Sequence, residues 1–220
     1  MKNTLTEIVF IIDKSGSMYN LVDDTIGGFN GFVKSQSAID GKAVLTTVLF
    51  SSDRKKLYDC VDLHAVEPLT AKQYVVGGST AMLDAIGETI EEVQKRHDDT
   101  PEAERPGQVL CVITTDGQEN ASTKYKKFQV QKMIEHQTKG HGWQFIFLGA
   151  NMDAVQEAAD IGITYSATYT ADSYGTKSVY DAVNIATTSL RGCGEITPDW
   201  DSVFIGSTNS SEKTHSKLMS

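Results

Sequence analysis

The chain has 220 residues, of which 40% are hydrophobic and 22% charged, a composition that suits one folded domain with a buried core. Its 29 acidic residues outnumber its 20 basic residues, and the formal net charge is −9. Binders of nucleic acids and anionic membranes depend on basic patches, so this balance argues against both as partners and permits cation binding.

The cysteine pattern excludes two further classes of site. Cys60, Cys111 and Cys193 lie far apart and form no CxxC pair, which argues against a zinc ribbon or a thioredoxin-like redox site. Sparse cysteines and a first segment without a signal-peptide pattern are typical of a reducing, intracellular setting. No apolar run approaches the roughly 20 residues of a membrane span. We therefore expect a soluble, cytoplasmic protein.

Apolar periodicity predicts strands and helices that alternate along most of the chain. The run at 8–12 is a continuous β-branched and aromatic strand, whereas the helix that follows it contains Gly27, Gly28 and Gly31, which suits a helix packed close to a neighbour. The short turn between the next two strands favours an antiparallel hairpin, because a parallel crossover needs about a dozen residues. In chain order, the predicted strands are 8–12, 43–50, 56–64, 109–113, 143–148 and 163–166, and the predicted helices are 21–37, 80–97, 124–139, 153–161 and 173–190.

Strands that alternate with helices are typical of a parallel sheet covered on both faces. We therefore predict an α/β fold with a doubly wound, mostly parallel sheet, one antiparallel edge strand, and helices on both faces. The predicted domain spans 1–194. A C-terminal extension, 195–220, is expected to be partly flexible, because residues 207–220 are rich in Ser, Thr, Asn and Lys.

Three segments at the ends of predicted elements carry polar oxygen atoms. Ligands of such sheets bind beyond the carboxyl ends of the strands. Asp13-Lys14-Ser15-Gly16-Ser17 follows the first strand, Thr115-Asp116-Gly117 follows the strand at 109–113, and Gly77-Gly78-Ser79-Thr80 precedes a helix. Carboxylates and hydroxyls are hard donors, which suit Mg²⁺, Mn²⁺ or Ca²⁺ and do not suit softer metals.

These three segments, in this order, resemble the von Willebrand factor A (vWA) domain, whose metal-ion-dependent adhesion site (MIDAS) uses the same trio of loops. The resemblance covers roughly residues 7–166 and implies a vWA, Rossmann-like fold of the stand-alone type found in bacteria and phages. Alignment of the residues after 80 favours Thr80 over Ser79 as a ligand. The metal ligands that the resemblance implies are Asp13, Ser15, Ser17, Thr80 and Asp116.

The resemblance also implies a function without catalysis. We expect a protein-binding module in which one cation, Mg²⁺ or in its place Mn²⁺ or Ca²⁺, accepts an acidic side chain of a partner protein. Neighbouring residues would shape the partner's footprint: Lys14, Met18, Tyr19 and 118–120. Two alternatives stay open, a hydrolase whose metal activates water against a phosphoester, and a structural subunit whose metal only ties loops together.

Each of these motifs also has a structural interpretation that involves no metal or ligand. Asp13, Ser15 and Ser17 are also typical of a turn that caps a helix. Residues 77–80 lack the Gly-x-x-x-x-Gly-Lys-Ser/Thr pattern of a phosphate-binding loop. The five histidines are scattered, and surface or strand positions are expected for them. Cys111 lies within a predicted core strand, where an inert, buried thiol is expected.

Overall fold

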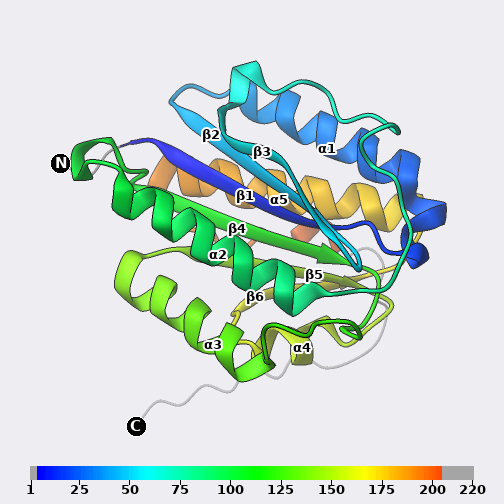
Figure 1. Ribbon diagram of the computed structural model, residues 1–220. Coiled ribbons are helices and arrows are strands. Elements are labelled where there is room, and N and C mark those ends of the chain that lie inside the picture. The colour runs from blue at the N-terminus through cyan, green and yellow to red at the C-terminus, as the bar shows by residue number, and fades with distance from the viewer. Residues whose placement is uncertain (1–3, 205–220) are drawn as a thin grey trace, which may run out of the picture.

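The structure, a computed structural model, describes residues 4–204 and contains a six-stranded sheet in the order β3-β2-β1-β4-β5-β6 (Figure 1). Neighbouring strands run parallel, except that β2 and β3 form an antiparallel hairpin at one edge. The predicted fold class is therefore confirmed. The strands are β1 Thr6–Asp13, β2 Ala43–Phe50, β3 Arg54–Asp62, β4 Gln108–Thr115, β5 Gln144–Ala150 and β6 Tyr165–Tyr169.

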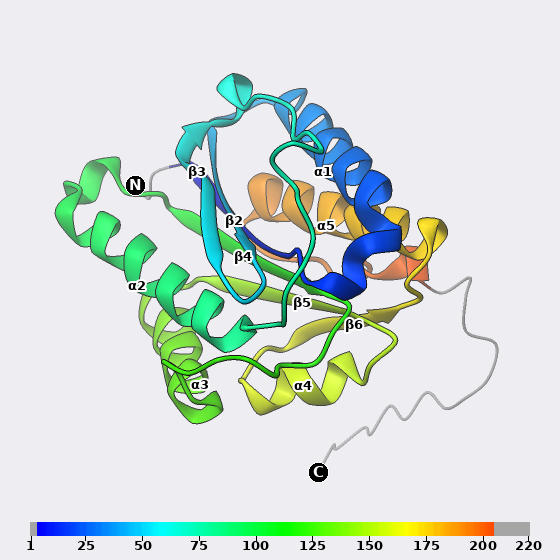
Figure 2. The ribbon, with the colours of Figure 1, turned by 45° about the vertical axis from the view of Figure 1, so that its right-hand side comes forward.

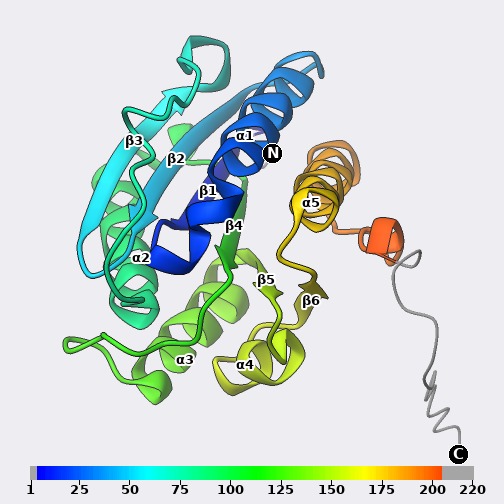
Figure 3. The ribbon, with the colours of Figure 1, turned by 90° about the vertical axis from the view of Figure 1, so that its right-hand side faces the viewer.

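Helices cover both faces of the sheet, α1 and α5 on one face and α2, α3 and α4 on the other (Figure 3). Alternate side chains of β1 pack on opposite faces of the sheet. Phe10 belongs to the core under α1 and α5, whereas Val9 and Ile11 belong to the core under α2, α3 and α4. Burial on both faces explains why the strand is apolar without interruption. The helices are α1 Val22–Ser37, α2 Met82–Asp99, α3 Lys127–His136, α4 Ala154–Asp160 and α5 Ser173–Cys193.

The glycines of α1 allow one close approach between helices. A Cβ atom placed on Gly28 would lie 2.1 Å from Cδ2 of Tyr180 on α5, whereas one on Gly27 would meet no atom within 4 Å. The predicted close neighbour of this helix is therefore α5, and Gly28 is the residue that faces the Tyr180 ring.

Several element boundaries differ from the predictions. The π-helical turn Gln137–His141 ends the third helix earlier than expected, and β6 lies two to three residues further along than the predicted strand at 163–166. Part of the predicted extension packs on the domain, since Ile196 and Trp200 are buried and Trp200 meets Tyr165 edge-on. The predicted flexible stretch 207–220 lies outside the described residues. Across 4–204, no helix combines the length and apolar character that a bilayer crossing requires.

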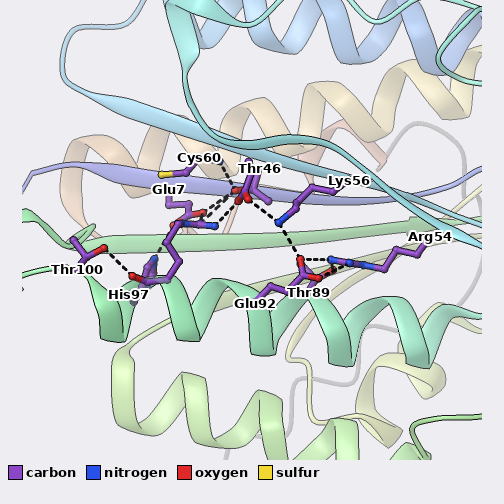
Figure 4. Close-up of polar contacts among 11 residues, drawn as sticks. Glu7, Thr46, Arg54, Lys56, Cys60, Thr89, Glu92, His97 and Thr100 are labelled. Atoms are coloured by element: carbon purple, nitrogen blue, oxygen red, sulfur yellow. Dashed lines mark hydrogen bonds and ion pairs between the residues drawn. The ribbon is translucent and has the colours of Figure 1, made fainter.

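A buried charge cluster lies near the amino-terminal end of β1 (Figure 4). The fully buried Glu7 carboxylate accepts a hydrogen bond from Thr46 Oγ1 at 2.9 Å, lies 2.7 Å from His97 Nε2 and pairs with Arg96. Burial by itself raises the pKa of Glu7, but the bond to His97 and the charge of Arg96 outweigh burial and hold that pKa below its usual range. The expectation of a surface or strand position is wrong for His97, which is buried on α2.

Candidate metal centre

The carboxyl ends of β1 and β4 lie side by side, so Asp13 meets the residues that close β4. Asp13 is fully buried, and its two carboxylate oxygens have separate partners. The Ser15 N–H donates to Oδ1 at 2.6 Å, and the Thr115 hydroxyl donates to Oδ2 at 2.6 Å. Burial raises the pKa of Asp13, and these hydrogen bonds oppose that rise only in part.

A chain of hydroxyls connects the first loop to Asp116. Ser15 Oγ lies 3.1 Å from Ser17 Oγ, and the Ser17 hydroxyl donates to Asp116 Oδ1 at 2.5 Å. Burial raises the pKa of Asp116, while the hydrogen bond from Ser17 lowers it. The structure thus brings four of the five predicted ligands into one hydrogen-bonded or directly adjacent group: Asp13, Ser15, Ser17 and Asp116.

Thr80 enters the same group from the connection that precedes α2. A Cβ atom placed on Gly117 would lie 3.2 Å from Thr80 Oγ1 and 3.6 Å from Ser17 Oγ, so both hydroxyls face Gly117. Ser79 is exposed, and its N–H donates to Ser52 Oγ at 2.7 Å. This geometry favours Thr80 over Ser79, and the ligand role of all five residues stays a prediction.

Backbone contacts fix the first loop in place. Figure 2 shows the connection from β3 to α2 passing beside the end of β1. Gly77 N–H donates to the Lys14 carbonyl at 2.8 Å, Gly16 N–H donates to the Gly78 carbonyl at 3.1 Å, and the buried Tyr74 hydroxyl donates to the Asp13 carbonyl at 2.5 Å. The polar side chains of the loop are therefore held on a backbone with its own hydrogen-bond partners.

The predicted footprint residues divide into buried and exposed ones. Lys14 is buried and reaches Ser51 Oγ at 2.9 Å and Asp53 Oδ1 at 2.6 Å, and Met18 is only 2% exposed. The prediction that these two side chains meet a partner is therefore wrong. Tyr19, which is 75% exposed, remains accessible beside the loops, as do Gln118 and Asn120, and Glu119 is half-buried.

The charges of the centre differ from those of the Glu7 cluster. Glu7 has a cationic partner in Arg96 and a second contact with the His97 ring, whereas Asp13 and Asp116 form no ion pair with any residue of the described range. Burying carboxylates without counter-charge is unfavourable, and a divalent cation would offset both. Two carboxylates and neutral hydroxyls are the oxygen donors that hard dications bind. The residues present therefore fit a resident divalent cation.

Sequence reasoning missed several side chains that shape this centre. Thr115 was noticed only as part of Thr-Asp-Gly, although a hydroxyl directly before Asp116 on β4 was a usable signal for a partner of Asp13. Tyr74 was not noticed, and Asn120 was expected only to contact a partner, because their contacts with Asp13 and Thr80 depend on the folded path of two loops.

A sheet of this order, with these loops at its carboxyl edge, is the architecture of the vWA domain, and the protein has the vWA fold. It is similar to a von Willebrand factor type A structure from Catenulispora acidiphila, with a TM-score of 0.60 and 17% identity over 84% of this chain and 43% of that one. It is also similar to proximal thread matrix protein 1 from the mussel byssus with a zinc-occupied MIDAS motif, with a TM-score of 0.57 and 17% identity over 84% and 46% of the two chains.

A third similar structure is manganese-loaded TRAP protein of Plasmodium vivax, with a TM-score of 0.55 and 19% identity over 77% of this chain and 70% of that one. No protein-family model and no curated protein sequence matches the chain. The chain spans less than half the length of the mussel and Catenulispora chains. The predicted vWA resemblance is confirmed in the fold.

Proposed function

We propose that the protein is a divalent-metal-dependent module that binds a partner protein. Its cation is Mg²⁺, for which Mn²⁺ or Ca²⁺ can substitute, and the partner contributes an acidic side chain to the metal. The residues that hold the cation are Asp13, Ser15, Ser17, Thr80 and Asp116.

One observation carries this proposal: two carboxylates, one of them fully buried, converge at the carboxyl edge of the sheet without a cationic side chain of the described range to pair with them. The remaining donors are hydroxyls, which add dipoles and no charge. When bound, the cation supplies a positive centre that attracts a further carboxylate. Mg²⁺ keeps several waters in protein sites, and a water is a position that a partner's carboxylate can take.

The solved structures add support for a metal. One neighbour has zinc in its MIDAS motif and another is loaded with manganese. Both metals are divalent, which agrees with the donor set of this chain. The choice of Mg²⁺ rests on the hard oxygen donors alone.

Binding is favoured over catalysis by the groups around the carboxylates. Within residues 4–204, the side chains that hydrogen-bond to Asp13 and Asp116 are the hydroxyls of Thr115, Ser15 and Ser17. None of them is a general acid or base of near-neutral pKa, which hydrolysis of a phosphoester would need beside the metal. We therefore propose that the centre binds a partner and catalyses no reaction.

Two measurements test the proposal. Calorimetric titration with Mg²⁺ and Mn²⁺ should show one site in the wild-type protein and none in Asp116→Asn. Proteins of the source organism should be retained by immobilised wild-type protein in Mg²⁺ and released by EDTA, and the Asp116→Asn matrix should not retain them. Partner retention that survives EDTA contradicts the proposal.

The alternatives give other outcomes in the same samples. Turnover of a generic phosphoester with Mn²⁺, lost in Asp116→Asn, would indicate a hydrolase. A metal that raises the melting temperature without changing partner retention would indicate a structural role.

A further inference from the structure

A short segment after Asp116, residues 119–122, forms hydrogen bonds with the loop that contains Thr80. Asn120 bonds both backbone groups of Thr80, because its Oδ1 accepts the Thr80 N–H at 2.9 Å and its own N–H donates to the Thr80 carbonyl at 3.1 Å. Two bonds to one residue fix the direction of its backbone as well as its position. Since Asn120 lies four residues after Asp116, these bonds also tie Thr80 to the Asp116 loop.

The same segment caps the start of α2. Ala81 precedes the helix and has no side chain that could cap it. Glu119 Oε2 accepts the Leu83 N–H at 2.8 Å, and Ser122 Oγ accepts the Asp84 N–H at 3.0 Å. N–H groups in the first turn of a helix have no partner within the helix, and a carboxylate there also interacts favourably with the helix dipole. These side chains therefore anchor the helix that directly follows Thr80.

Glu119 is itself held in the conformation that this capping requires. Its Oε1 accepts the N–H groups of Ala121 and Ser122 at 2.9 and 2.7 Å, and its Oε2 also accepts the Ser122 hydroxyl at 2.8 Å. Asp84, on α2, forms hydrogen bonds in the other direction, because its carboxylate accepts hydrogen bonds from the three N–H groups of residues 123–125. The two segments are thus interlocked through contacts from both sides.

We propose that Asn120, supported by Glu119 and Ser122, is a positioning residue for the metal centre; this inference rests on the proposed function. We call these three residues the 119–122 clamp. Mg²⁺ demands near-octahedral oxygen geometry. If the cation had to order the Thr80 loop itself, the entropy lost in ordering would subtract from its affinity. The 119–122 clamp orders that loop in the metal-free protein, so that the Thr80 hydroxyl already faces Gly117, as the Ser17 hydroxyl does.

The test compares Mg²⁺ affinity by calorimetry with exchange of the Thr80 amide hydrogen in the metal-free protein, followed by NMR. Asn120→Ala removes the side-chain acceptor, and we expect a Kd about tenfold higher, as for the loss of one stronger hydrogen bond, together with faster Thr80 exchange. Asn120→Asp keeps an acceptor oxygen, so it should keep the slow exchange and bind Mg²⁺ no more weakly than the wild type. Thr123→Ala is the matched control, since this exposed hydroxyl forms no hydrogen bond with another residue of the described range and alanine keeps the backbone N–H that donates to Asp84, so it should change neither value.

Three outcomes would overturn the inference. Faster Thr80 exchange with unchanged Mg²⁺ affinity in Asn120→Ala would show that the 119–122 clamp holds the backbone without serving the metal. An equal loss of affinity in Thr123→Ala would assign the effect to the loop in general. A wild-type protein that binds neither Mg²⁺ nor Mn²⁺ would overturn the proposed function and this inference with it, whereas the first two outcomes leave the proposed function intact.

Discussion

The Thr115 hydroxyl donates to the buried Asp13 carboxylate at 2.6 Å, and this bond joins the ends of two strands that are far apart in the sequence. The same hydroxyl contacts the carbonyl oxygen of Gly117 at 2.9 Å and the N–H of Gly117 at 3.1 Å. One side chain therefore sets both the orientation of Asp13 and the turn that presents Asp116.

Thr115→Val should destabilise the metal-free protein. The substitution keeps the shape of the side chain but leaves a buried carboxylate oxygen without its donor, which costs about 1–3 kcal/mol in the free energy of unfolding. Urea denaturation at neutral pH measures this cost. Thr115→Ser retains the hydroxyl and should recover most of it. A Val variant as stable as the wild type would contradict the role assigned to this bond.

Asp13→Asn should have opposite effects with and without metal. Burial raises the folded-state pKa of Asp13 above its unfolded value, so its stabilising contribution is present at low pH and is lost as the pH rises through the folded-state pKa. At neutral pH the ionised carboxylate therefore disfavours the metal-free fold. The amide that replaces it is neutral, can accept from the Ser15 N–H and can donate to Thr115 Oγ1, so the metal-free variant should unfold at a higher temperature than the wild type.

The metal response of the same variant should disappear. At Mg²⁺ about a hundredfold above its Kd, the wild-type protein should gain about 2.7 kcal/mol in the free energy of unfolding, whereas Asp13→Asn should gain none. Denaturation with Mg²⁺ and with EDTA makes the comparison. A lower melting temperature for the metal-free variant would mean that its amide does not fit the site.

The Glu7 cluster predicts sensitivity to acid. The folded-state pKa of Glu7 lies below the unfolded value of 4.5, because contacts with His97 and Arg96 outweigh burial. Its stabilising contribution is therefore present above about pH 4.5 and is lost as the pH falls through the lower folded-state pKa. Glu7→Gln should lose up to about 3 kcal/mol at neutral pH by leaving the Arg96 guanidinium without its buried carboxylate partner.

The pH dependence of the free energy of unfolding distinguishes the loss of a shifted carboxyl from a general packing defect. Between about pH 6 and about pH 3, the free energy of unfolding of Glu7→Gln should fall less steeply than that of the wild type, because one shifted carboxyl is gone. Parallel slopes for the two proteins would count against the assignment.

The two neighbouring glycines of α1 should respond to alanine in opposite directions. Gly28→Ala puts a Cβ atom against the Tyr180 ring, and overpacking of this kind costs about 1–3 kcal/mol. Gly27→Ala meets no atom within 4 Å at an exposed helical position and should stabilise the protein by up to about 1 kcal/mol. Thermal unfolding of both variants tests the pair, and equal effects would contradict the packing of α1 on α5.

Local sequence was enough to predict those helices and strands whose apolar pattern and flanking turn residues mark their own ends. The strand at 43–50 was predicted with the bounds of β2, since its apolar residues are bounded by turn residues on both sides. The helix expected from residue 80 begins at Met82, because its capping groups come from Glu119 and Ser122, which no local pattern connects to it. The helix expected from residue 124 begins at Lys127, and the preceding residues Lys124 and Tyr125 donate their N–H groups to Asp84 on α2, a contact that no local pattern predicts.

The predicted ligand residues could be named because motifs preserve residue types at fixed spacing, and the alternation of strands and helices predicted which loops share an edge. Which neighbours would be accessible could not be predicted. Lys14 lies between Asp13 and Ser15 in the motif, yet it points to Ser51 and Asp53 in the turn after β2. Its direction depends on a contact between segments 37 residues apart.

The position of β1 between β2 and β4 has a consequence for synthesis of the protein on the ribosome. Until residues 108–115 have emerged, the nascent chain carries an apolar strand with one unpaired edge, which is the kind of edge that other chains can join. Fragments that end before β4 are therefore candidates for aggregation, and chaperone demand should be highest during this part of translation.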